Sequence, residues 1–196
     1  MGEEQVQRFT VQSTRILGVI GLVIVAVFVL VGATGIDDSY EAPAYIVCGI
    51  VAMLLWVAVL RPSVAVEGDR LVLRNPLNTV RIPLAAIEQL VIRQWLVVSV
   101  GGRRYTNAGI SRSRRQGMRD DRHTGDTGEE LGALSYGGFA ERRIQKLAED
   151  ARERLGVKPY SDEQEARAAD VQRDWAWPEI AALCLLAVAL VVTLLV

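Results

Sequence analysis

The chain's single histidine, His123, lies in the stretch "RDDRHTGD" beside Asp120, Asp121 and Asp126. Imidazole and carboxylate groups are the side chains that bind divalent metals or exchange protons in catalysis. A lone histidine within a polar stretch rich in Gly, Asp and Arg is nevertheless typical of a solvated loop. We therefore predict no metal site, no cofactor and no catalytic residue in this stretch.

Other sequence motifs also fail to indicate an enzyme. The segment "GDTGEELG" lacks the Gly-Lys-Ser/Thr of a phosphate-binding loop and the acidic spacing of an EF-hand, and "SVGGRRY" is not a nucleophile elbow. Cys48 and Cys184 lie far apart in apolar runs, without metal-binding or redox spacing. Thiols in such places behave as small hydrophobic groups. The prediction is a non-catalytic protein.

Arginines gather in the segment "RRYTNAGISRSRRQGMRDDR". The members are Arg103, Arg104, Arg112, Arg114, Arg115, Arg119 and Arg122. A solvated, flexible loop is the simplest interpretation, because charge runs are usually solvated. Contact with anionic lipid heads is the second, and there each arginine near the surface contributes about 1 kcal/mol. Nucleic-acid binding also requires basic residues, but no motif or aromatic stacking platform supports it here.

The elements that must position these residues begin with three apolar runs. We expect membrane helices over 16–36, 44–60 and 178–196, with an external loop over 37–43. Each run approaches the ~20 residues that cross a bilayer, whereas apolar runs of about 10–14 residues are more typical of buried helices in soluble proteins. The first run is too long for a signal-peptide core and a second run follows it closely. Trp175 and Trp177 precede the third run as interfacial anchors.

Charges flanking the first two runs predict the orientation. The connecting loop "DDSYEAP" contains acidic residues and no Lys or Arg, whereas Arg8, Arg15 and Arg61 lie at the other ends of the two runs. The positive-inside rule therefore places the N-terminal segment 1–15 and the residues from Arg61 to about Trp175 in the cytoplasm. The third run then crosses outward, so the C-terminus is expected outside. The expected location is the cell membrane, with several spans.

A small β domain is expected over 61–156. Glu67-Gly68-Asp69 separates two Val/Leu-rich runs as a hairpin turn, and Pro83 should end the next strand. Further strands are expected near 90–93 and 95–100, with a Gly101-Gly102 turn and a return strand through Tyr105. These strands predict a meander or a partly closed barrel, in an α+β membrane protein.

An amphipathic helix over 139–155 should cover the open side of this barrel, after a basic loop over 108–138. Its apolar face consists of Ala140, Ile144, Leu147, Ala148, Ala151 and Leu155. Gly156 is placed to end the helix. The connector 157–177 is polar and has no apolar stripe, so we expect a solvated helix or a flexible link there.

The segment "RPSVAVEGDRLVLRNPLNTVRIPLAAIEQL" and the hairpin "VVSVGGRRY", preceded by two apolar runs, resemble the small pleckstrin-homology-like (PH-like) domains of actinobacterial membrane proteins. That group is named after a mycobacterial low-molecular-weight protein antigen, and the resemblance covers about 17–106. It implies a PH-like barrel of unassigned activity in a bacterial protein. Phosphoinositide-binding PH domains need basic residues in their first hairpin loop, and here that loop is Glu67-Gly68-Asp69.

Two hypotheses for function follow. The first is a membrane-anchored interaction module that presents the barrel to a protein partner or to the inner-leaflet lipids. The second is an accessory subunit of a larger membrane complex, with the apolar helices as its interface. Small residues would allow close helix packing, either with another subunit or within the hairpin itself. They are Gly18, Gly21, Gly32, Ala44, Gly49 and Ala52.

The orientation is testable with reporter fusions. A reporter inserted near Gly125 should be cytoplasmic and one fused after Val196 should be external. The reason is that Arg15 and Arg61 lie at the two ends of the hairpin, and the chain continues from Arg61 to Gly125 without another apolar run. Paired alkaline phosphatase and fluorescent-protein fusions measure both positions. An external Gly125 would overturn the arrangement.

Overall fold

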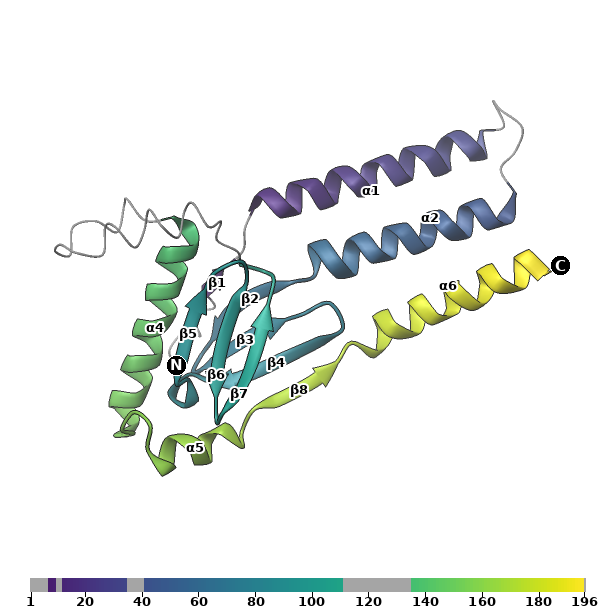
Figure 1. The fold of residues 1–196 in the computed structure, drawn as a ribbon. Helices are drawn as coiled ribbons and strands as arrows, with labels where there is room; N and C mark the ends of the chain where they lie inside the picture. Colours follow the sequence, from purple (N-terminus) through teal and green to yellow (C-terminus); the bar gives the residue numbers. More distant parts are fainter. Residues whose placement is uncertain (1–6, 10–11, 35–40, 111–134, 196) are drawn as a thin grey trace, which may run out of the picture. The chain divides into compact units, whose positions relative to one another are not determined.

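The computed structural model describes residues 7–9, 12–34, 41–110 and 135–195 (Figure 1). The chain is α+β and divides into two units, which we call the β unit and the helical unit. The β unit contains Met1–Val11, Ser63–Asn75 and Thr79–Asp174. The helical unit contains Gln12–Pro62, Pro76–Asn78 and Trp175–Val196.

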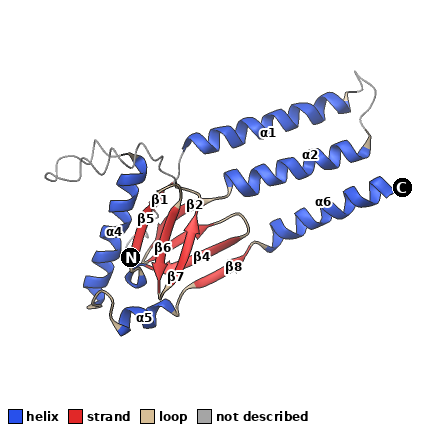
Figure 2. Cartoon of the chain, in the orientation of Figure 1, coloured by secondary structure: helices blue, strands red, loops and turns tan. Residues whose placement is uncertain are grey.

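Two antiparallel sheets form the β unit (Figure 2). The five-stranded sheet has the order β1-β2-β3-β4-β8, with β1 Gln7–Phe9, β2 Ser63–Glu67, β3 Arg70–Arg74, β4 Asn78–Pro83 and β8 Gln172–Trp175. The three-stranded sheet has the order β5-β6-β7, with β5 Gln89–Ile92, β6 Leu96–Val100 and β7 Arg103–Asn107. Gly68 turns at φ 60° between β2 and β3, and Gly101 and Gly102 turn at φ 54° and 68° between β6 and β7. The strands and turns expected from the sequence over 63–107 are thus present.

Strand β1 lies before the first apolar helix, where the sequence predicted only an N-terminal segment. It pairs with β2, with Gln7 opposite Val66 and Phe9 opposite Val64. The hairpin of apolar helices is therefore inserted between two neighbouring strands of one sheet. Local sequence does not reveal so short a strand, because its hydrogen-bond partners lie more than 50 residues away in the chain.

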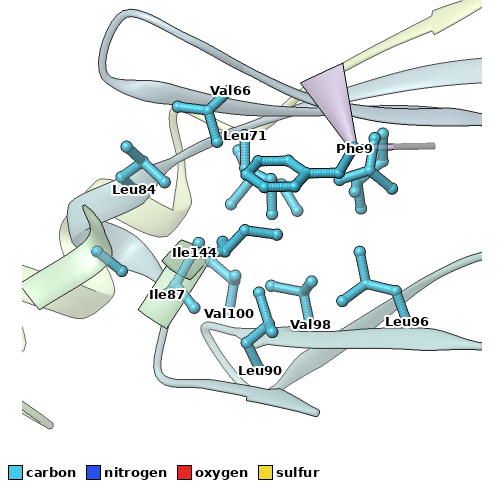
Figure 3. Packing of buried hydrophobic residues seen from close by; sticks show 14 of the residues in the cluster. Phe9, Val66, Leu71, Leu84, Ile87, Leu90, Leu96, Val98, Val100 and Ile144 are labelled. Carbon is cyan, nitrogen blue, oxygen red and sulfur yellow. The ribbon is translucent and has the colours of Figure 1, made fainter. Parts of the chain in front are cut away.

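The core lies between the two sheets and under helix α4, Tyr136–Leu155 (Figure 3). Phe9, Leu71, Leu90 and Val98 contribute side chains from both sheets, and Ile144 contributes from α4. The predicted apolar face of the helix is largely confirmed, with Ala140, Ile144, Ala148 and Ala151 buried, Leu147 partly buried and Leu155 exposed. The helix begins three residues earlier than predicted, because the Ser135 Oγ accepts a hydrogen bond from the Gly138 N–H.

Buried and partly buried polar side chains also join separate elements of the β unit. The Asn107 Nδ2 donates to the carbonyl oxygen of Arg74 and to the Asn75 Oδ1, both at 2.8 Å, and so links the end of β7 to the end of β3. Gln145 and Arg152 of α4 donate to the carbonyl oxygens of Leu90 and Ile87. These bonds fix the helix and the two sheets relative to one another within the unit.

The polar connector contains a short, mostly exposed helix, as one of the two sequence expectations held, but it also packs onto the β unit, which the sequence did not predict. It forms helix α5, Asp162–Ala168, and then β8, which pairs along β4. Gln164 is 2% exposed; its Nε2 donates to the carbonyl oxygens of Ile87 and Ala85 at 2.9 and 3.3 Å, and its Oε1 accepts from the Tyr160 N–H. Packing here depends on one buried amide rather than on an apolar stripe, which is why helical periodicity did not reveal it.

The helical unit contains three helices long and apolar enough to cross a membrane. They are α1 Gln12–Ala33, α2 Ala42–Leu55 with the π-helical continuation η1 Trp56–Leu60, and α6 Trp177–Leu195. Each apolar helical stretch has 19 residues. Helix α2 packs against both α1 and α6 (Figure 1).

Small residues bring these helices close together. A Cβ on Gly18 would lie 2.8 Å from Val59, and one on Gly21 would lie 2.9 Å from Leu55, so both glycines permit the contact between α1 and the second helix. A Cβ on Gly49 would lie in ordinary contact with Leu186 of α6. Gly18 and Gly21 thus pack the hairpin on itself, as the second of the two sequence interpretations held.

Replacing Gln164 tests whether α5 belongs to the packed β unit. Gln164→Leu should lower the free energy of unfolding by about 1–3 kcal/mol, because the carbonyl oxygens of Ile87 and Ala85 and the N–H of Tyr160 lose their partner. Urea denaturation of the detergent-solubilised full chain, followed by circular dichroism, measures the change. Glu163→Leu at the neighbouring exposed position is the matched control. Equal stability of the two variants would mean that α5 is not part of the cooperative unit.

Candidate functional site

A polar junction lies where the second apolar helix ends and the third begins, entirely within the helical unit. The Arg61 Nε donates to the Glu179 Oε1 at 2.9 Å, and the Arg61 Nη1 donates to the Pro76 carbonyl oxygen at 2.9 Å. The side chains of Arg61 and Glu179 are 17% and 21% exposed, so most of the ion pair is shielded from solvent. Charge-assisted bonds of this kind are stronger than neutral ones and fix both partners.

Local sequence places both charged residues at helix ends. The Arg61 N–H closes the π-helical segment by donating to the Trp56 carbonyl oxygen, and Pro62 then prevents further helix. Glu179 lies in the first turn of α6, where a carboxylate interacts favourably with the helix dipole. The two termini therefore carry opposite charges at the same end of the helical unit.

The turn between β3 and β4 belongs to the same junction. The Ala176 N–H donates to the Leu77 carbonyl oxygen at 2.9 Å, beside the bond from Arg61 to Pro76. We use the name membrane-end junction for Arg61, Pro76, Leu77, Ala176 and Glu179. Sequence reasoning used Arg61 only for orientation and missed Glu179, although opposite charges at the ends of two apolar runs were visible.

The predicted interfacial tryptophans flank this junction. Trp175 is 49% exposed and Trp177 is 69% exposed, whereas Ala176 between them is buried. Leu77 in the adjoining turn is 40% exposed. The junction thus combines a shielded ion pair with exposed apolar side chains.

Only part of the predicted basic surface lies in the described residues. Arg103 and Arg104 are exposed on β7. Consecutive strand residues point to opposite faces of a sheet, so these two arginines do not form one patch. Arg112, Arg114, Arg115 and Arg119, like His123 and its acidic neighbours, lie outside the described residues.

Arg103 lines a hollow of about 300 Å³ in the β unit. Its lining residues are Val100, Gly101, Arg103, Tyr105, Glu165, Ala168, Ala169 and Val171, from the β6–β7 hairpin and from α5 with the residues after it. Gly101 is required where the two elements meet, because a Cβ there would lie 2.6 Å from the Ala168 Cβ. The hollow therefore exists only because the connector folds back onto the sheet.

Two opposite charges border this hollow. Arg103 and Glu165 carry these charges, and no ion pair among the described residues joins the two side chains. Tyr105, partly buried against the core, lies in the lining with them. The hollow presents a hydrogen-bond donor group and an acceptor group to one space.

Within residues 7–9, 12–34, 41–110 and 135–195, no group of three or more His, Cys, Asp or Glu side chains could hold a metal ion. Comparison with known proteins gives no relative: no family model, no curated protein and no solved structure matches this chain. Interpretation of the candidate sites therefore rests on their own geometry.

The ion pair can be tested by removing its acidic partner. Glu179→Ala should lower the unfolding free energy of the helical unit by about 1.5–3 kcal/mol, because it leaves a shielded guanidinium without its carboxylate. Unfolding in mixed micelles of mild detergent and dodecyl sulfate, followed by tryptophan fluorescence, measures the effect. Glu41→Ala is the control, since Glu41 is exposed and its side chain makes no capping bond to α2.

A double-mutant cycle then isolates the pair itself. If the losses caused by Arg61→Ala and Glu179→Ala simply add in the double variant, the two side chains do not stabilise each other.

Proposed function

We propose that this protein is a membrane-anchored, non-catalytic interaction module of a bacterial cell membrane. Three apolar helices anchor a cytoplasmic PH-like β unit, which presents a binding surface to a protein partner or to the inner leaflet. The observation that carries the proposal is the insertion of the helical hairpin between β1 and β2. Residues before and after the hairpin in the chain form one sheet, so the apolar helices are joined to a folded β unit at both of their ends.

The order of elements supports a PH-like assignment. Strands β1 to β4 follow one another across the first sheet, β5 to β7 form the second, and α4 then packs against the core. A succession of short hairpin-linked strands and then a covering helix is what the sequence predicted for the PH-like domain. The inserted helices, α5 and β8 are additions to that succession.

The pairing of β1 with β2 also supports the proposed topology. Residues before α1 and residues after η1 lie in one sheet, so a hairpin that crosses a bilayer must begin and end on the same side. Arg15 and Arg61 flank the hairpin at that side. The positive-inside rule makes it the cytoplasmic side.

The hollow beside α5 is the surface we assign to a protein partner. Arg103 and Glu165 border it with opposite charges, and this suits a peptide segment that carries an acidic and a basic side chain. The acidic first hairpin loop, Glu67 to Asp69, does not suit clustered phosphates. Contact of the basic segment with anionic lipids remains part of the proposal.

The test uses the full chain, because a fragment that begins at Arg61 and ends at Gly156 would lack β1, α5 and β8. Proteins are cross-linked in cells, purified in mild detergent and quantified by mass spectrometry. Arg103→Glu or Glu165→Arg should reduce recovery of a true partner about ten-fold or more, the effect of losing one charge-assisted contact. Arg93→Glu, an exposed charge reversal in the β5–β6 turn, should leave recovery unchanged.

The same experiment addresses the alternative, an accessory subunit joined through its helices. Val23 of α1 and Val188 of α6 are exposed, and Val→Trp changes there would obstruct a helix interface. Partners whose recovery is unchanged in both hollow variants but lost with Val23→Trp or Val188→Trp would contradict the interaction module and support the accessory subunit.

A further inference from the structure

We propose that the turn at Pro76 and Leu77, between β3 and β4, is a lipid-contacting element: Leu77 enters the headgroup layer beside Trp175 and Trp177. The inference requires that the three apolar helices cross a bilayer, and it is independent of the partner-binding role. It assigns a binding surface for lipid to a turn that, by sequence, only connects two strands.

The depth of the turn follows from its hydrogen bonds within the helical unit. Helical segment η1 ends at Leu60 and α6 begins at Trp177, so Arg61 and Ala176 lie where the apolar helices meet the polar layer. Arg61 donates to the Pro76 carbonyl oxygen and Ala176 donates to the Leu77 carbonyl oxygen, both at 2.9 Å. The backbone of the turn therefore lies within hydrogen-bond distance of the residues at the ends of the apolar helices.

The same two bonds make partial immersion possible. A backbone carbonyl without a partner is costly to move out of water, and these two already have theirs. The turn "NPLN" contains no charged side chain. Arg61, which holds the turn, is paired with Glu179, so these two charges do not oppose the approach of lipid.

Side-chain exposure identifies the occupant as lipid. Leu77, Trp175 and Trp177 are 40%, 49% and 69% exposed, at the ends of helices whose outer faces are also apolar and exposed. Tryptophan is enriched at the headgroup level because its ring is apolar with one polar N–H. Trp177 is the first residue of α6 and Leu77 is hydrogen-bonded to Ala176, so these exposed side chains adjoin the apolar helix α6, which favours lipid over a separate protein ligand.

The test places a fluorescent label at Leu77 in the full chain. Cys48→Ala and Cys184→Ala remove the native thiols, Leu77→Cys carries an environment-sensitive nitrobenzoxadiazole group, and the protein is placed in phosphatidylcholine and phosphatidylglycerol nanodiscs. Tyr160→Cys, at an 80% exposed position of the β unit, is the aqueous reference, and Val188→Cys on α6 is the hydrocarbon reference. Lipids with a nitroxide near the headgroup and soluble iodide serve as the two quenchers.

We expect the Leu77 label to be quenched by the lipid nitroxide about two-fold or more above the Tyr160 label, and to be less accessible to iodide. Leu77→Trp provides a second probe that keeps an apolar side chain, and its added emission should fall in brominated lipid. A Leu77 label that matches Tyr160 with both quenchers, together with Leu77→Trp emission unaffected by brominated lipid, would overturn the inference. That outcome would not bear on partner binding at the hollow, which the Arg103 and Glu165 variants test separately.

Discussion

The antiparallel pairing of β1 with β2 is the constraint on which the rest of the structure depends. Gln7, Arg8 and Phe9 lie opposite Val66, Ala65 and Val64, although two apolar helices separate the strands in the chain. Bringing such distant segments together has an entropic cost, which is small here because the antiparallel hairpin itself returns the chain near its starting point. Phe9 is then 6% exposed and belongs to the core between the sheets. Without this pairing β2 would be an unprotected edge strand.

Polar groups at the ends of apolar elements complete both units. In the helical unit, Arg61 and Glu179 satisfy each other where two apolar helices end, and glycines of α1 allow the hairpin to close tightly. In the β unit, Asn107 and Gln164 satisfy backbone groups that the sheets leave unpaired. Since each buried polar group is costly without a partner, these few side chains select one arrangement from many that the apolar residues alone would permit.

The chain passes between the two units at β1–α1, η1–β2, β3–β4 and β8–α6. Three of these crossings lie beside a feature with a proposed role: Arg61 and Glu179 pair at the helix ends, and we assign Leu77, Trp175 and Trp177 to lipid contact. The hollow with Arg103 and Glu165 lies within the β unit, where α5 meets the β6–β7 hairpin. Anchoring and partner recognition are thereby assigned to different residues, so each can be altered without removing the other.

The sequence by itself determined the features that depend on neighbouring residues. The long apolar runs, the Val- and Leu-rich strand runs, the turn glycines and the apolar face of α4 are local features, because strand and helix geometry repeats over a few residues. It also indicated Trp175 and Trp177 as exposed residues beside α6, and Arg103 and Arg104 as surface residues. The roles of Arg112, Arg114, Arg115 and Arg119 stay predictions.

Only the tertiary structure decided β1, β8, the packing of α5, the junction and the hollow. Arg61 and Glu179 are 118 residues apart, and Gln164 lies 77 and 79 residues from the carbonyl groups it binds. No periodicity links residues at such separations, and each contact involves single polar side chains rather than a repeated pattern. Their positions follow from which strands pair and which helix ends meet, and that is settled when the chain folds as a whole.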